Sequence, residues 1–297
     1  MIHSMDRATL PLTDQFPTVV DWIEQQLDEP LTLERVAAQA GYSPFHFSRL
    51  FTARMGRSVM AHVRGRRLVR GARRLCSGEP DLKLVDLAFD CGFESQEAFT
   101  RAFKRVFGVS PGRFRSGFAV DPIEGQYPMI APTAKTAAVV RLPELARLPS
   151  FHVAGPARRF DEATKSDIPQ LWSALIGALP FEGQVKSWAT YGVVSSVDEG
   201  QGCFQYLAGV GVEPGCVPPP GFSMMEIPAA TYAVFRITLD GSALHPQVKQ
   251  AMAVVWGELL PASGLKAAGG PDFELYDGRF DPLKAGSVID FHVPVQA

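Results

Sequence analysis

A segment between Gly92 and Arg115 combines an apolar stripe with polar side chains suited to nucleic acid. Phe99, Ala102, Phe103 and Val106 follow the i, i+3, i+4, i+7 spacing of one helix face. The other positions hold arginine, lysine, threonine, glutamine and glutamate, types that contact base edges and phosphates in DNA grooves. The side chains expected to do so are Gln96, Glu97, Thr100, Arg101 and Lys104. The alternative is a surface helix whose basic face meets only solvent.

The same pattern occurs a second time upstream. A short apolar helix precedes each copy and ends at a glycine, Gly41 or Gly92, as expected for a left-handed C-terminal cap. A helix closed by glycine, a tight turn and a second helix form the helix-turn-helix arrangement. Two copies in register favour DNA binding over a merely solvated helix. The matching residues of the two copies are Phe47 and Phe99, Ser48 and Thr100, Arg49 and Arg101, Phe51 and Phe103, and Gly56 and Gly108.

Residues 16–117 resemble the DNA-binding region of the AraC family of transcription regulators. The run from Gly92 to Pro111 carries most of the resemblance, because it nearly reproduces the family signature. The resemblance implies seven helices, with two recognition helices that enter successive major-groove segments on one face of the duplex. It also implies base contacts by Phe45, Ser48 and Arg49 from the first recognition helix and by Gln96, Glu97, Thr100 and Arg101 from the second.

A longer helix, expected over residues 59–76, joins the two units and sets the angle between them. Its narrow inner stripe is apolar, and arginines cover the rest of its surface. These arginines either reach phosphate or pair with acids such as Asp86 or Asp90. They are Arg64, Arg66, Arg67, Arg70, Arg73 and Arg74.

The second half of the chain predicts an α+β fold built from two similar units. Each unit reads as strand, strand, helix, strand, strand, and the run from Pro214 to Gly221 separates them. Proline and glycine pairs mark a linker before the first unit. We therefore expect a multi-domain chain: an all-α double helix-turn-helix domain over residues 10–118, a linker over 119–137, and an α+β domain over 138–297 with a groove between two pseudo-symmetric halves.

This second half is similar to the GyrI-like small-molecule-binding domain. The similarity rests on the runs at 225–235, 256–261 and 273–276. It implies an aromatic cleft with one acid, Glu274, at its floor. Strand alternation places Glu274 and Tyr276 on one face, and a carboxylate among aromatic rings suits a lipophilic cation. The aromatic side chains considered for the walls are Tyr191, Trp188, Tyr232, Trp172 and Trp256. For each of them ordinary core packing is the alternative, and for Glu274 it is a simple surface position.

Charge distribution separates the two halves more clearly than the formal net charge of -2. Residues 43–117 hold 15 Lys and Arg against 6 Asp and Glu, whereas residues 119–297 hold 12 against 18. Only the first block is therefore expected to meet a polyanion such as double-stranded DNA. The four cysteines lack C-x-x-C spacing and the six histidines lack H-E-x-x-H, so no metal or cofactor is expected. No run is apolar enough for a membrane span, and a cytoplasmic protein with reduced thiols is expected.

Three functions remain open from the sequence. The first is a one-chain transcription regulator whose second half senses a small-molecule effector. The second makes that half a GyrI-like hydrolase, in which Glu274 works with Tyr191 or Tyr232 as general acid and base. The third is an effector-independent regulator whose second half binds another protein, such as RNA polymerase. The first function is favoured by the resemblance to GyrI-like small-molecule-binding domains. No nucleophile elbow, metal set or phosphate loop independently supports catalysis.

Overall fold

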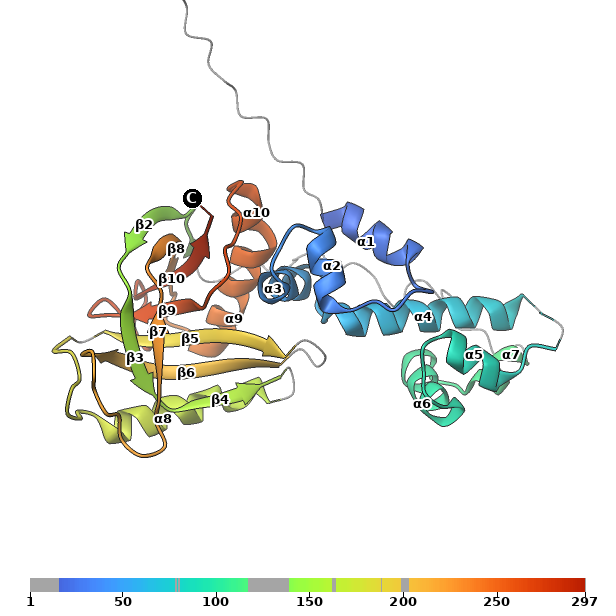
Figure 1. The fold of residues 1–297 in the computed structure, drawn as a ribbon, viewed down its shortest axis with the longest axis horizontal. Coiled ribbons are helices and arrows are strands. Elements are labelled where there is room, and N and C mark those ends of the chain that lie inside the picture. Colours follow the sequence, from blue (N-terminus) through green and yellow to red (C-terminus); the bar gives the residue numbers. More distant parts are fainter. Residues whose placement is uncertain are drawn as a thin grey trace, which may run out of the picture.

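The computed structural model describes residues 16–77, 79, 81–116, 139–161, 164–187, 189–198 and 203–296. A helical N-terminal half and an α+β C-terminal half meet along helix α3, as Figure 1 shows. The linker expected over 119–137 and the outer limits of the expected helical domain, residues 10–15 and 117–118, lie outside the described residues.

The helical half contains the two expected helix-turn-helix units, α2 with α3 and α5 with α6. Gly41 and Gly92 have positive φ angles of 69° and 76° in the turns between the paired helices, which a glycine adopts without steric cost. The Ser43 and Ser95 hydroxyls cap the second helix of each pair by accepting a backbone N–H. The helices are α1 (Phe16–Gln25), α2 (Leu33–Gln39), α3 (Pro44–Met55), α4 (Val59–Cys76), α5 (Leu84–Asp90), α6 (Gln96–Phe107) and α7 (Pro111–Arg115).

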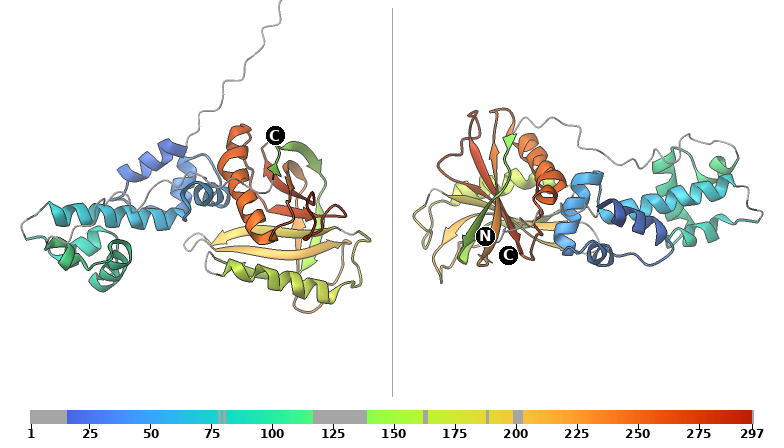
Figure 2. Two further views of the ribbon diagram at one scale, coloured as in Figure 1. Left: turned by 180° about the vertical axis from the view of Figure 1, so that it is seen from behind. Right: turned by 90° about the horizontal axis from the view of Figure 1, so that it is seen from above.

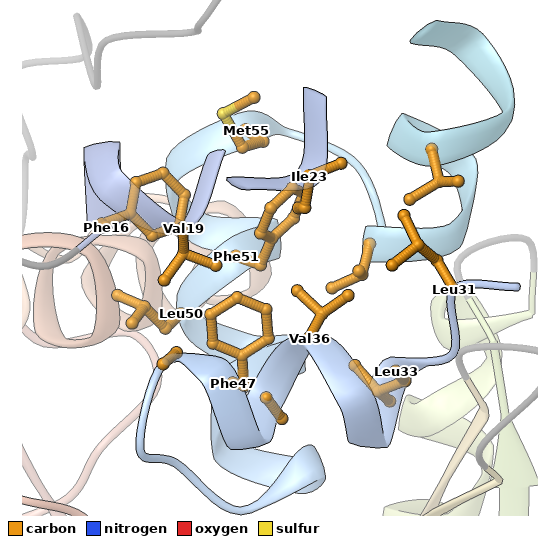
Figure 3. Packing of buried hydrophobic residues seen from close by; sticks show 14 of the residues in the cluster. Phe16, Val19, Ile23, Leu31, Leu33, Val36, Phe47, Leu50, Phe51 and Met55 are labelled. Atoms are coloured by element: carbon orange, nitrogen blue, oxygen red, sulfur yellow. The ribbon is translucent and has the colours of Figure 1, made fainter. Parts of the chain in front are cut away.

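Each helix-turn-helix unit has its own hydrophobic core, and α4 contributes to both. Phe47 and Phe51 are fully buried in the first core, seen in Figure 3, together with Val63 from the start of α4. Phe99 and Phe103 are fully buried in the second core with Ala72 from the end of α4. Burying one such side chain contributes roughly 1.5–3 kcal/mol. The two cores therefore position both recognition helices against the same helix, α4.

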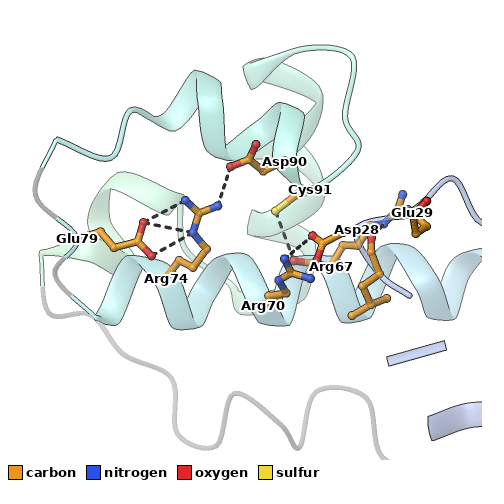
Figure 4. A network of polar contacts seen from close by, with 9 residues as sticks. Asp28, Glu29, Arg67, Arg70, Arg74, Glu79, Asp90 and Cys91 are labelled. Carbon is orange, nitrogen blue, oxygen red and sulfur yellow. Dashed lines mark hydrogen bonds and ion pairs between the residues drawn. The ribbon is translucent and has the colours of Figure 1, made fainter. Parts of the chain in front are cut away.

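Several arginines of α4 join this helix to neighbouring helices and to the segments that connect them. Arg66 pairs with Glu24 of α1, and its Nη2 lies 3.0 Å from Oε2. Arg70 pairs with Asp28, and Arg74 bridges Glu79 and Asp90. Figure 4 shows the Arg70 and Arg74 pairs on one side of the helix. The expected alternative of pairing with Asp90 is thus confirmed for Arg74, whose Nη1 lies 2.7 Å from Oδ2.

The C-terminal half is a ten-stranded antiparallel sheet with the order β1-β8-β10-β9-β5-β6-β3-β7. In addition, β2 pairs with β8, and β4 pairs with β6. Two prolines interrupt the strands of the first unit, because proline cannot donate to the ladder. Pro143 lies between β1 and β2, and Pro156 lies between β3 and β4. The strands are β1 (Val139–Val140), β2 (Glu144–Leu148), β3 (Phe151–Gly155), β4 (Ala157–Phe160), β5 (Thr190–Asp198), β6 (Cys203–Val212), β7 (Ser223–Ile227), β8 (Ala230–Thr238), β9 (Asp272–Tyr276) and β10 (Val288–Val295).

The predicted pseudo-symmetry between the two units of the α+β half is confirmed. The two units also exchange strands, which the sequence did not predict. Strands β5 and β9 meet at the centre of the sheet. The first strand of each unit pairs across to the other unit, β2 with β8 and β7 with β3. The two units of the α+β half are therefore interlocked rather than separate. The helical elements of this half are η2 (Lys165–Asp167), α8 (Ile168–Ala178), α9 (Leu244–Val254), the π-helical turn η3 (Val255–Leu259) and α10 (Leu260–Ala262).

The two faces of the sheet carry different clusters. On one face, α8 packs over Val194, Tyr206 and Ala208, while α9 and η3 pack over Phe235 and Phe291. The opposite face gathers Val153, Leu207, Tyr232 and Phe273, together with side chains from the outer strands β2 and β7. The sheet is therefore curled around this second cluster.

Candidate functional site

The outer face of α6 matches the surface expected to contact DNA. Gln96, Glu97, Arg101 and Lys104 are exposed and Thr100 is half-buried, while Phe99 and Phe103 on the inner face are fully buried. Both Figure 1 and Figure 2 show α5–α7 at the end of α4 that lies away from the sheet. The second recognition helix is thus presented to solvent, with its basic face open.

Helix α3, the first recognition helix, lies against the α+β half instead. It packs on α9 and η3 and touches β5, and Figure 2 shows from two further sides how the blue helices meet the red ones here. Arg54 donates from Nε to the Gly257 carbonyl at 2.9 Å. Gly257 belongs to η3, and π-helical turns are uncommon in proteins and often lie at functional sites.

Phe45 and His46 form the N-terminal part of this contact. Phe45 packs against the cluster of Val194, Tyr206 and Ala208 under α8. The His46 ring is fully buried and stacks on Trp256 with 5.4 Å between ring centroids. Burial, aided by the nearby charge of Arg49, lowers the pKa of His46 to about 3, so this ring is neutral where it meets Trp256.

Arg49 is the centre of the contact. Its guanidinium carbon lies 5.2 Å from the Trp256 ring centroid and 5.9 Å from that of Phe291, both within the range of cation–π attraction. Its Nη1 lies 3.6 Å from Oδ1 of Asp272 on β9, and its side chain is 22% exposed. Phe45 and Arg49, which are expected to contact DNA, therefore contact the α+β half of the chain in this structure. Ser48 of the same helix is half-buried.

Asp272 is fully buried, and no described residue donates a hydrogen bond to either of its carboxylate oxygens. The 3.6 Å separation from Arg49 makes an ion pair but is too long for a hydrogen bond. Burial raises the pKa of Asp272 to about 7, against the opposing effect of the Arg49 charge. This carboxylate therefore depends on the guanidinium as its nearby positive charge.

Glu274 lies two residues along β9, on the same face, inside a hydrogen-bonded shell. The hydroxyls of Tyr206 and Tyr276 each donate to Oε2 at 2.9 Å, and the Trp172 indole N–H donates to the Tyr206 oxygen at 3.2 Å. Glu274 is 8% exposed. Burial raises its pKa, whereas the two tyrosine hydrogen bonds and the charge of Arg49 lower it.

Gly192 makes room for this shell. It pairs with Glu274 across β5 and β9, so both residues face the same side of the sheet. A Cβ at this position would lie 2.1 Å from the Tyr206 hydroxyl and 2.5 Å from Oε2 of Glu274. Only a residue without a side chain allows the acid and the tyrosine to meet here.

The structure brings together only part of the expected aromatic wall. Trp172 and Tyr276 contact each other beside Glu274, with 5.1 Å between their ring centroids, while Trp256 lies next to Arg49. Tyr191 and Tyr232 pack around Phe273 on the opposite face of the sheet. The expected pairing of Glu274 with Tyr191 or Tyr232 is therefore wrong, because strand alternation directs their side chains away from the carboxylate. Trp188 lies outside the described residues.

Two residues of the site were not anticipated, Asp272 and Tyr206. Asp272 precedes Glu274 by two residues, so strand alternation alone places both acids on one face. Tyr206 carried no such local signal, because its position opposite Glu274 depends on how β6, β5 and β9 align.

The described residues contain no group of three or more His, Cys, Asp or Glu residues that could hold a metal ion. None of their helices is long and apolar enough to cross a membrane. Cys91 is buried, and burial raises the pKa of its thiol to about 11.

Both halves of the chain match known families. A family model described as a helix-turn-helix domain matches residues 36–117, and one described as an integron-associated effector binding protein matches residues 144–295. An integron cassette protein from Vibrio cholerae has 18% sequence identity, covers 54% of this chain and 99% of its own, and gives a TM-score of 0.41.

Two curated relatives match the helical half. The multiple antibiotic resistance protein MarA of Salmonella typhimurium is 40% identical over 99 residues, which cover 33% of this chain and 76% of MarA. The right origin-binding protein of Escherichia coli is 40% identical over 107 residues, which cover 34% of this chain and about a third (36%) of that protein's length. The chain thus belongs to the AraC-type family of DNA-binding transcription regulators, and its α+β half belongs to the family of integron-associated effector binding proteins.

Proposed function

We propose that the chain is a sequence-specific transcription regulator whose α+β half senses a lipophilic monocation. The observation that carries the ligand class is the pair of buried acids on β9, Asp272 and Glu274, set among aromatic rings. A buried carboxylate is costly unless a positive charge offsets the loss of water. Rings such as Trp256 and Phe291 would add roughly 0.5–2 kcal/mol each by cation–π attraction.

Within this site we propose Glu274 as the anchor for the cation. Its two tyrosine hydrogen bonds hold the carboxylate in one orientation and favour its charged form. Trp172 and Tyr276, which meet edge to face beside it, would supply the apolar contact that selects a lipophilic ligand over a hydrated ion. The ligand contacts expected from Tyr191, Tyr232 and Trp188 remain predictions.

The test compares two ligands of similar shape but different charge, methyltriphenylphosphonium and the neutral triphenylphosphine oxide. Glu274→Gln keeps the size of the side chain and removes its charge. We expect the affinity for the cation to fall about tenfold or more, since roughly 1.4 kcal/mol corresponds to a factor of ten, while the neutral ligand is little affected. The control is Glu258→Gln, which removes an exposed acid of η3. An equal loss for both ligands would show that the carboxylate is not the anchor.

For the helical half we propose that Gln96, Glu97, Thr100 and Arg101 contact base edges and that Lys104 contacts phosphate. Support comes from their shared place on the exposed face of α6 and from the excess of basic residues in this half. The same role is proposed for Phe45, Ser48 and Arg49 of α3, which would require α3 to leave the α+β half.

A hydrolase is the second candidate, and one observation favours it. The Glu274 carboxylate lies within hydrogen-bond distance of two tyrosine hydroxyls, and burial raises its pKa, as suits a general base. Incubation of the full chain with aryl esters distinguishes the candidates. Turnover that is lost in both Glu274→Gln and Tyr206→Phe would support the hydrolase, whereas saturable binding without turnover supports the sensor.

A further inference from the structure

The surface of α3 that lies against the α+β half is the surface expected to read DNA. Phe45 and Arg49 both point into the α+β half, and Ala53 and Arg54 continue the contact about one turn beyond Arg49. The equivalent surface of α6 is open to solvent. One recognition helix is therefore available to DNA, while the other is covered by the chain itself.

The side chains that α3 inserts have the chemistry expected of the effector. Arg49 supplies a delocalised cation between the rings of Trp256 and Phe291 and beside the Asp272 carboxylate. Phe45 supplies an aromatic group that packs on the cluster containing Tyr206. A lipophilic cation likewise combines a positive charge with an apolar, aromatic surface.

The surroundings of the Asp272 carboxylate favour a positive charge at this place. The carboxylate is fully buried, and no described residue donates a hydrogen bond to it. Withdrawal of Arg49 would leave this buried carboxylate without its counter-ion, so it would have to take up a proton or pair with another cation, at a cost in free energy. Another cation in the same place would remove that cost. Arg49 also lies close enough to Glu274 to lower its pKa, so one guanidinium serves both acids.

We infer that α3 is an internal occupant of the effector site, in which Arg49 takes the place of a cationic effector, and that a lipophilic cation binds by displacing it and releasing α3 to DNA. The inference rests on the proposed cation-sensing function and adds the residue that the effector replaces. Because both ligands then require the same undocked state, the effector raises the affinity for DNA and DNA raises the affinity for the effector by the same factor.

A reversible disulfide tests the displacement. A Cβ on Gly257 would lie 3.6 Å from the Cβ of Ala53, within the range of about 3.5–4.5 Å found in disulfides. The double variant Ala53→Cys/Gly257→Cys should therefore lock α3 in place when oxidised and release it when reduced. Serine replaces Cys76, Cys203 and Cys216 in all proteins compared, and the Ala53→Cys single variant controls for oxidation itself.

Two measurements are made on the full chain, oxidised and reduced. Calorimetry should show methyltriphenylphosphonium binding at least about tenfold more weakly to the oxidised protein. Methyltriphenylphosphonium should also strengthen binding to a duplex selected from random sequences by the wild-type chain, but only in the reduced protein. Equal cation affinity in the two forms would overturn the inference and leave the proposed function standing. Failure of the disulfide to form would overturn it too, because the docked helix would then not exist in solution.

A second variant should increase the affinity for the cation, whereas the loss of a residue with a purely structural role would decrease it. Arg49→Ala removes the internal cation and leaves the site to the ligand, so methyltriphenylphosphonium should bind about tenfold more tightly or better. Lys249→Ala, which removes an exposed positive charge from α9, should leave the affinity unchanged. Unchanged or weaker binding by Arg49→Ala overturns the displacement. Absence of cation binding in every form, Arg49→Ala included, refutes the proposed function itself.

Discussion

Arg49 and Arg101 occupy equivalent positions in the two recognition helices but have different surroundings. Arg101 is exposed on the outer face of α6, whereas Arg49 lies 3.6 Å from the buried Asp272 carboxylate of the α+β half. Sequence repetition makes the two helices look interchangeable. The structure gives only Arg49 of this pair contacts with the α+β half.

Arg101→Ala should weaken specific DNA binding by roughly 1–3 kcal/mol, as expected when an arginine that contacts a base edge is lost. The measurement is a titration of a duplex selected from random sequences by the wild-type chain. Lys249→Ala, which removes an exposed charge from the α+β half, is the control and should have no effect. An Arg101 variant that binds as tightly as the wild type would refute the proposed placement of α6 in a groove.

Tyr206→Phe should shift the pH dependence of cation binding upward. The Tyr206 and Tyr276 hydroxyls lower the pKa of Glu274, which burial raises. Only the ionised carboxylate holds a cation, so affinity is lost as the pH falls through the pKa of Glu274. Removing one hydrogen bond to a charged group, worth roughly 1.5–3 kcal/mol, should move that loss to higher pH by about one unit or more.

The matched control is Tyr191→Phe, which keeps the aromatic ring and its packing and removes only a hydroxyl, on the face of the sheet opposite Glu274. Methyltriphenylphosphonium affinity is measured in both variants and the wild type from acidic to mildly alkaline buffers. Superimposable profiles for Tyr206→Phe and the wild type would mean that the hydrogen bond does not hold the Glu274 charge.

Gly192→Ala should destabilise the α+β half and abolish cation binding. The new Cβ would overlap the Tyr206 hydroxyl and the Glu274 carboxylate, and overpacking of this kind costs about 1–3 kcal/mol. Gly177→Ala is the control, since a Cβ on this exposed residue of α8 meets no atom within 4 Å. Thermal unfolding and calorimetric titration should separate the two alanine variants clearly. Similar behaviour of both would show that the space beside Glu274 is not limiting.

The parts of the fold that could be predicted are those determined by nearby residues. The glycine turns at Gly41 and Gly92, the apolar stripe through Phe99 and Phe103, and the strand face shared by Glu274 and Tyr276 all follow from local spacing. Each needs only a few consecutive residues to be recognised, and each is confirmed.

The parts that could not be predicted depend on residues far apart in the chain. The exchange of β2 and β7 between the halves, the approach of Tyr206 to Glu274 and the pairing of Arg49 with Asp272 each need the alignment of distant segments. The hydrophobic periodicity of the sequence does not indicate how these distant segments align. Arg49 in particular fits a DNA contact and an internal ion pair equally well by residue type, and only the docking of α3 distinguishes them.

The stability of the helical half should fall in acid because of His62. This residue of α4 is buried against the Phe51 ring, and burial, followed by the charges of Arg57 and Arg66, lowers its pKa to about 4. Its folded pKa lies below the ordinary value of about 6.5, so the unfolded chain binds the proton more readily. The stabilisation is therefore complete above about pH 6.5 and is lost as the pH falls towards 4, by about 3 kcal/mol in total.

His62→Gln removes this titrating group and should make the fall less steep by one proton, about 1.4 kcal/mol per pH unit. Urea unfolding followed by far-ultraviolet circular dichroism at several pH values measures the slope. His245→Gln, at an exposed position of α9, is the control and should leave the slope unchanged. His46, whose pKa burial also lowers, keeps its own contribution in both variants, so a slope in His62→Gln equal to that of the wild type would show that His62 does not remain neutral in the folded chain.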